Sequence, residues 1–173
     1  MDILYLLADK SIKATEKREQ IAQALENGET TVKEIKTYAL DDKTVGIILE
    51  AMESVSRTRP QAADIEWLNY AGTYITAASN TVKREASRVV GNISHLFPDK
   101  IDGLLPSLLE NTKSDGTVIR WGSAYALGQI VRIPKFANSN LFDVLTDLAE
   151  QEAENGVKNQ YSNGLKKAKQ LRK

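Results

Sequence analysis

The sequence predicts an all-α protein in which pairs of helices stack side by side. No stretch alternates apolar and polar residues as a half-buried strand would, whereas apolar residues recur at helical spacing in short segments. Turn-forming residues separate these segments, and the short connections favour antiparallel neighbours. One apolar pattern also returns about every 37 residues, which indicates a repeated two-helix unit.

The composition limits the kinds of function that the chain can have. Its 173 residues suffice for one compact domain or a short repeat array, and 23 basic residues balance 23 acidic ones. Zero net charge argues against a dedicated binder of nucleic acid or acidic membranes. The chain has no cysteine and a single histidine, His95, so we expect no thiolate or histidine-rich metal site and no cofactor.

The N-terminal residues 1–10 contain a short apolar run. This run is too short to cross a bilayer. It also lacks the basic start and the cleavage site of a secretory signal. We therefore expect a soluble, cytoplasmic protein with no membrane partner.

Helix stops and starts place the helices along the chain. The Asn-Gly pairs at 27–28 and 155–156 are typical helix ends, because these residue types tolerate the left-handed conformation. Thr31 with Glu34 fits a capping box, and Asp99 is an expected N-cap. Prolines after helical runs mark further ends. The expected helices cover residues 12–27, 31–39, 43–58, 62–77, 81–97, 100–113, 117–133, 140–154 and 157–171.

The repeated pattern is clearest in the second helix of each unit. A cation accompanies it at Lys83, Arg120 and Lys158, and a weaker copy of the pattern begins at Thr44. The matching apolar sets are Val82, Ala86, Val89, Val90 and Ile93; Ile119, Ser123, Ala126, Leu127 and Ile130; and Val157, Tyr161, Gly164, Leu165 and Ala168.

Such units cannot bury their apolar faces alone, but stacking gives them a continuous core. We therefore predict a single α-solenoid domain over residues 1–173. Small residues in the segment 122–128 would let neighbouring helices approach closely. The alternative is a globular helical bundle with chance internal similarity. The expected parts are cap helices in 1–30, a degenerate repeat in 31–58, and repeats in 62–97, 100–133 and 140–171.

The unit 100–133 resembles the HEAT-repeat family. Pro106 matches the proline that these repeats often carry in their first helix, and Asp115 and Arg120 match an aspartate in the turn and an arginine early in the second helix. These repeats close with two small residues followed by Ala, Leu and Gly, and this pattern is matched by Gly122, Ser123, Ala126, Leu127 and Gly128. The resemblance implies a right-handed α–α superhelix, and such arrays are mostly binding scaffolds.

One outward stripe of the expected second helices is the candidate partner-binding surface. At 100° per residue, Trp121, Tyr125 and Arg132 point away from the core side of their helix, as do Arg84 and Arg88 one unit earlier. In HEAT-like arrays the second helices line the concave face, so these five residues would lie in one groove. The alternative is that Trp121 and Tyr125 pack under a neighbouring loop or terminus.

Other conspicuous residues have structural interpretations. We expect Asp115 to bond free backbone N–H groups in its turn and Arg120 to pair with an aspartate across units. We expect His95 to be a solvated side chain near a helix end. The basic C-terminal run would solvate the exposed end of the array, although it is also suited to an acidic partner or nucleic acid. This run comprises Lys166, Lys167, Lys169, Arg172 and Lys173.

The sequence therefore favours a non-catalytic protein-binding scaffold. Trp, Tyr and Arg are the residue types that anchor interfaces. The alternative is nucleic-acid binding in the manner of DNA-alkylation-repeat proteins, in which arginines hold phosphates and Trp121 stacks on a base. An enzyme is the weakest hypothesis, because no catalytic motif, phosphate loop or metal-ligand spacing is present.

Overall fold

The computed structural model describes all 173 residues, and all of its regular secondary structure is helical. The all-α prediction is therefore confirmed. No helix is long and apolar enough to traverse a lipid bilayer. The α-helices are α1 (Ile3–Ala8), α2 (Ala14–Glu26), α3 (Val32–Ile35), α4 (Asp42–Thr58), α5 (Ile65–Tyr74), α6 (Asn80–Ile93), α7 (Leu105–Asn111), α8 (Thr117–Ile130), α9 (Pro134–Ala137), α10 (Leu141–Gln151) and α11 (Asn155–Ala168).

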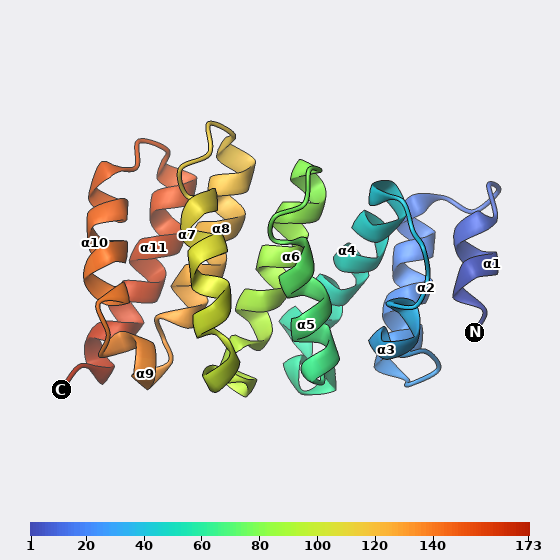
Figure 1. Cartoon of the computed structure of the whole chain (residues 1–173), viewed down its shortest axis with the longest axis horizontal. Coiled ribbons are helices and arrows are strands. Elements are labelled where there is room, and N and C mark those ends of the chain that lie inside the picture. Colours follow the sequence, from blue (N-terminus) through green and yellow to red (C-terminus); the bar gives the residue numbers. More distant parts are fainter.

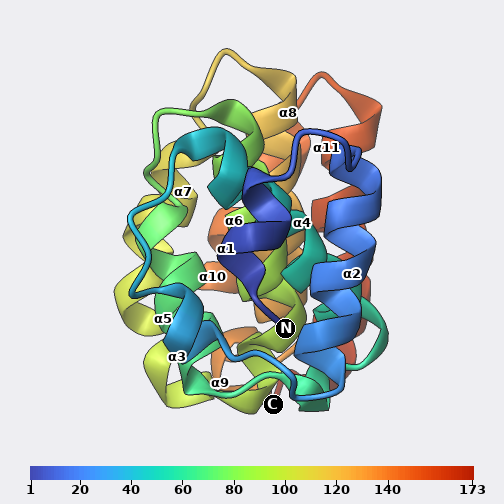
Figure 2. The ribbon, with the colours of Figure 1, turned by 90° about the vertical axis from the view of Figure 1, so that its right-hand side faces the viewer.

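The helices form an extended row in two layers. Along one layer α2 packs on α4, α4 on α6, α6 on α8 and α8 on α11. In the other layer, α5, α7 and α10 each pack on the helix that follows them in the chain. Figure 2 looks along the row and shows α3, α5 and α7 on one side and α2, α4 and α11 on the other. We call α4, α6, α8 and α11 the second-helix row.

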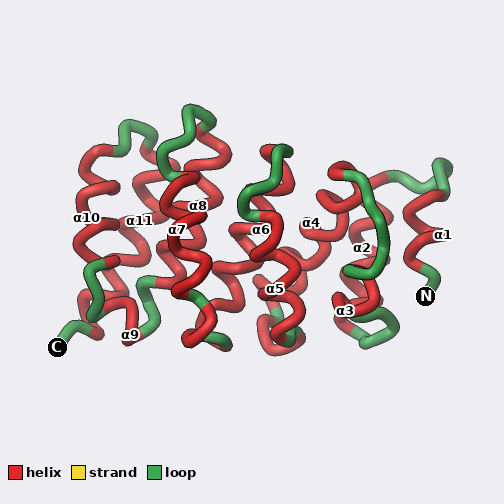
Figure 3. Tube along the Cα trace, in the orientation of Figure 1, coloured by secondary structure: helices red, strands yellow, loops and turns green.

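Loops reverse the chain between the two layers, and most of them lie at the ends of the helices (Figure 3). Several of these loops begin the next helix with a side-chain cap, of which the one at Thr31 is predicted from the sequence. Asp41 Oδ1 accepts a hydrogen bond from the Thr44 N–H at 2.8 Å. Thr31 Oγ1 accepts one from the Glu34 N–H at 3.2 Å. The carboxylate of Glu34 accepts from the Tyr38 hydroxyl instead of closing a reciprocal capping box.

Some helix boundaries differ from those expected. The helix expected over 100–113 begins only at Leu105, after short 3₁₀ turns, so Asp99 caps no α-helix. Pro134 follows the α8 run, but it also occupies the first turn of α9, where the missing N–H of proline has no cost. The helix α1 lies in the region expected to hold cap helices but before the first helix range expected there, and it is capped by Asp2, whose side chain accepts a hydrogen bond from the Tyr5 N–H.

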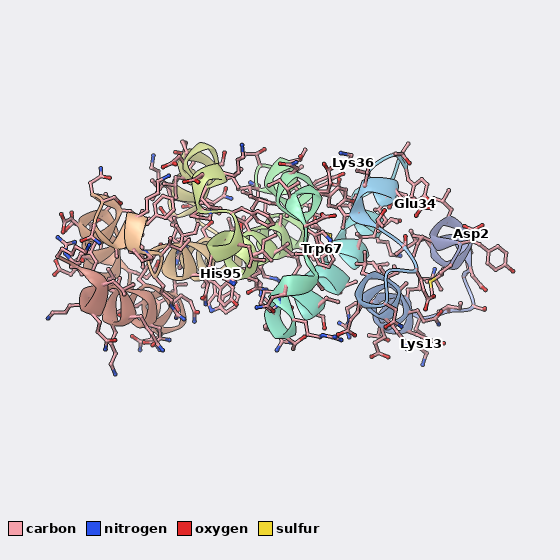
Figure 4. All side chains as sticks on the ribbon, turned by 90° about the horizontal axis from the view of Figure 1, so that it is seen from below. Asp2, Lys13, Glu34, Lys36, Trp67 and His95 are labelled. Atoms are coloured by element: carbon pink, nitrogen blue, oxygen red, sulfur yellow. The ribbon has the colours of Figure 1, made fainter.

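One continuous apolar core runs from α1 to α11. Most of the residues that the repeat aligns lie in it: Val89 and Leu127 are fully buried, and so is Ala168 at the far end. Trp67 of α5 is also in this core (Figure 4). Because the core is shared along the row, each helix pair covers apolar surface of its neighbours.

Small residues set the distances within the second-helix row. A Cβ added to Gly91 of α6 would lie 2.8 Å from Ala126 Cα of α8. A Cβ on Gly128 would lie 2.5 Å from the Gln160 carbonyl oxygen of α11, and one on Gly164 would lie 2.6 Å from Gly128 Cα. Gly128 is therefore buried in the α8–α11 contact, although its angle on the helical wheel places it on the outward stripe.

We predict that Gly164→Ala destabilises the chain by about 1–3 kcal/mol or more, because a methyl group there must push two backbones apart. Gly156→Ala is the matched control on the same helix, since nothing lies within 4 Å of its added Cβ. This control should be neutral or stabilising by about 0.5–1 kcal/mol. Urea denaturation of both variants measures the difference. Equal midpoints would show that α8 and α11 do not meet at these glycines.

Candidate functional site

An aromatic pair and a guanidinium group meet where α6 packs on α8. The rings of Trp121 and Tyr125, one helical turn apart, stack with centroids 5.6 Å apart and planes at 18°. The guanidinium carbon of Arg88 lies 5.5 Å from the Trp121 ring centroid and 5.9 Å from that of Tyr125. We call these three residues the Arg88 cluster. Cation–π attraction holds the guanidinium against both rings.

Two buried carboxylates hold Arg88 in this position. Its Nη2 lies 2.6 Å from Glu53 Oε1 of α4, and its Nη1 donates to Glu85 Oε2 at 3.0 Å. Arg57 and Arg84 pair with the same two carboxylates at 3.2 and 2.6 Å. Burial raises the pKa of Glu53, against the lowering effect of the Arg88 and Arg57 charges. The charge of Arg88 is thus already balanced within the protein.

Tyr125 is also fixed by hydrogen bonds. Its hydroxyl donates to Asn92 Oδ1 at 2.5 Å, and Asn92 Nδ2 donates to the Ser56 hydroxyl of α4 at 3.0 Å. Burial raises the pKa of the Tyr125 hydroxyl, and the Glu53 carboxylate adds to this shift. The ring is therefore a neutral, oriented part of the face formed by α4, α6 and α8.

A recess opens beside Trp121. It has a volume of about 380 Å³, and all of its lining residues belong to α6 and α8. No loop or terminus contributes to its lining, in contrast to the alternative considered from sequence. Val118 is 46% exposed at this recess. Sequence reasoning missed Thr117 and Val118; the available signal was an apolar residue three positions before Trp121 on the outward side. The lining residues are Arg84, Arg88, Thr117, Val118 and Trp121.

A charged groove continues from this recess towards the N-terminal end. It has a volume of about 670 Å³ and lies between α2, α4 and α6. Its four arginines are all in ion pairs, including the half-buried Arg18, which lies 3.8 Å from Glu50. Five glutamates line it, so the groove is not an electropositive track. These glutamates are Glu19, Glu26, Glu50, Glu53 and Glu85.

Arg132 lies apart from the other four candidate residues. It follows α8 and lines a separate cavity with polar residues of α11 and of the 3₁₀ turn after it. The structure therefore brings Arg84, Arg88, Trp121 and Tyr125 together and leaves Arg132 near the opposite end of α8. His95 is exposed in the 3₁₀ turn after α6 (Figure 4).

Arg120 connects α8 to the turn between α10 and α11. It donates to both carboxylate oxygens of Glu152 at 3.0 and 3.3 Å and to the backbone oxygens of Ser114 and Asp115 at 3.0 Å. The expected aspartate partner is therefore replaced by Glu152, and Asp115 contributes its carbonyl. Burial alone would raise the pKa of Glu152, but hydrogen bonds from Arg120 and the Glu154 N–H bring that pKa below its ordinary value.

Comparison with known proteins gives a likeness in fold only. No protein-family model matches the chain, and no curated protein has a significant match to it. Among solved structures, the chain is similar to a crystal structure of an engineered protein, with a TM-score of 0.53 over 99% of this chain and 98% of that chain. The sequence identity is 13%, so this likeness concerns the helical architecture.

We predict that Arg88→Ala destabilises the chain by about 2–4 kcal/mol, because it leaves Glu53 and Glu85 as poorly compensated buried charges. Since Arg88 is 22% exposed, this figure lies below the range for a fully buried pair. Arg18→Ala, in the same groove but in a longer, partly exposed ion pair with Glu50, should cost less than about 0.5 kcal/mol. Denaturant titration of both variants checks the contrast, and a small effect at Arg88 would contradict the network.

We predict that Glu152→Gln costs about 1 kcal/mol at pH 7, where the charge-assisted bond to Arg120 is complete. A carboxyl group with a lowered folded-state pKa stabilises the fold above its unfolded pKa and loses this contribution as the pH falls. The stability gap between wild type and variant should therefore shrink below about pH 4.3. Urea titrations at several pH values measure it, with the exposed Glu110→Gln as control. A gap independent of pH would contradict this role.

Proposed function

We propose that the chain is a short, HEAT-like α-solenoid that acts as a non-catalytic cytoplasmic scaffold and binds a segment of a partner protein on its second-helix row. Supporting this, the second-helix row packs closely, whereas α5 with α7 and α7 with α10 contact each other only sparsely. An array with one row packed more closely than the other curves towards the closer row. The second-helix row would then line the concave face.

The observation that carries the proposal is the recess beside Trp121. Its apolar surface comes from Val118 and Trp121, and its rim is polar at Arg84 and Arg88, whose charges are balanced by Glu85 and Glu53. Trp, Tyr and Arg supply much of the binding energy in protein interfaces. Stacking and hydrogen bonds already fix the Trp121 and Tyr125 rings, so a partner does not have to order them. We infer that the recess takes an apolar or aromatic side chain of the partner.

Nucleic acid has less support as the ligand of this surface. The arginines that would hold phosphates, Arg84 and Arg88, are paired with Glu85 and Glu53. The adjoining groove adds further carboxylates, which would repel a phosphate backbone. A catalytic role is also not favoured, because the buried carboxylates contact arginines and no nucleophile.

We predict that Trp121→Ala weakens the binding of selected peptides at least about 30-fold, the effect of losing roughly 2 kcal/mol at an aromatic anchor. The peptides would come from a phage-displayed random library panned on the wild-type chain, and titration calorimetry would measure their affinity. We expect apolar or aromatic residues in the selected sequences. The urea midpoint should change little, because Trp121 is only half-buried.

Tyr5→Ala is the matched control, since it removes an aromatic side chain that is 73% exposed on α1, outside the proposed face. It should leave peptide affinity unchanged. Failure to select peptides, or equal binding by wild type and Trp121→Ala, would refute the proposed function.

A further inference from the structure

A second cavity, near the C-terminal end of α8, has an unusual charge composition. It measures about 330 Å³ and is lined by three cations and two side-chain amides, with no carboxylate. The structure gives none of these five side chains an ion pair or a hydrogen bond. In the groove between α2, α4 and α6, by contrast, every arginine is paired. The lining residues are Arg132, Asn163, Lys166, Lys167 and Gln170.

The fold concentrates these groups on one side. Asn163, Lys166, Lys167 and Gln170 follow the i, i+3, i+4, i+7 spacing of a single helix face, so α11 and the turn after it present them together. Arg132 comes from the turn after α8, and its Nε is buried without an acceptor. The four side chains from α11 and the turn after it are exposed and Arg132 is half-buried, so water screens part of the repulsion among the three cations. An oxyanion between them would relieve the remainder.

We infer that this cavity binds an oxyanion group of the partner polypeptide, a carboxylate or a phosphorylated side chain; this inference rests on the proposed function for the class of partner. A guanidinium fork with two ammonium groups and two amide donors suits either anion. A polypeptide is favoured over nucleic acid because the cation cluster is local. The same row of helices carries the glutamates of the N-terminal groove, which would repel a continuous phosphate backbone.

One short peptide can reach both subsites. Trp121 and Arg132 are separated by roughly 16 Å along the axis of α8, at 1.5 Å per residue. An extended chain advances about 3.3 Å per residue, so about five residues cover this span. The inferred partner segment therefore carries an apolar residue and, about five residues away, an acidic or phosphorylated one.

The test uses the full chain, labelled with ¹⁵N, and two synthetic peptides without apolar residues. One peptide is glutamate-rich, and the other carries phosphoserine in place of glutamate. We expect at least one of them to shift the side-chain amide signals of Asn163 and Gln170. The peptide that binds identifies the source of the oxyanion. Replacing both Lys166 and Lys167 by Gln should weaken this binding roughly fivefold to tenfold.

Replacing Lys169 and Lys173 by Gln is the matched control. It removes two charges from the same basic run but outside the cavity, and it should change the affinity less than about twofold. Trp121→Ala should leave the binding of these peptides unchanged, since they carry no apolar anchor. The anion subsite is thus tested separately from the Trp121 recess.

Two results would overturn the inference. The first is that neither peptide shifts the amide signals of Asn163 and Gln170. The same conclusion follows if the double variant at Lys166 and Lys167 weakens binding no more than the control variant at Lys169 and Lys173. The proposed function would still stand if library peptides continued to require Trp121. The second is that single-stranded oligo(dT) binds more tightly than both peptides and loses this affinity in the Lys166→Gln, Lys167→Gln variant. The ligand would then be nucleic acid, and the proposed function would fail as well if the library also gave no Trp121-dependent peptides.

Discussion

The close approach of backbones along the second-helix row is the constraint on which the rest of the structure depends. Where α8 meets α11, Gly128 faces Gly164 and the Gln160 carbonyl, and where α6 meets α8, Gly91 faces Ala126. At larger separations the apolar sets of successive units would no longer share one core. The outward side chains of α6 and α8 would also move apart, and with them the Arg88 cluster and the recess beside it.

Charges on this face are used in two different ways. Around Arg88, buried carboxylates from α4 and α6 balance the guanidinium, so it orients Trp121 and Tyr125 instead of offering a free charge. Near the C-terminal end, Lys166 and Lys167 have no such partners. A neutral overall composition therefore conceals an uneven distribution, with internal compensation in the first half of the row and an excess of cations in the second.

The sequence was sufficient to predict the all-α class, most helices and the placement of Arg84, Arg88, Trp121 and Tyr125 on one face, because apolar periodicity and the repeat interval determine which positions are equivalent. It did not predict ion-pair partners such as Glu152, because these depend on the register between helices far apart in the chain. The angle of Gly128 on the helical wheel does not reveal its contact with α11, because α8 contacts helices on more than one side. Arg132 was grouped with Trp121 by angle alone, which ignores its distance along the axis.

The position of α10 and α11 at the end of the row gives the two inferred subsites different local stabilities. This pair is attached through the end of the shared apolar core, the glycine contact on α8 and the bond between Arg120 and Glu152. If α10 and α11 unfold locally as a unit, the cavity lined by Arg132 and the α11 side chains is lost, whereas the recess between α6 and α8 remains. Amide hydrogen exchange in α11 would then slow when an anion occupies the cavity, because a ligand that binds only the folded helix pair stabilises this pair against local unfolding.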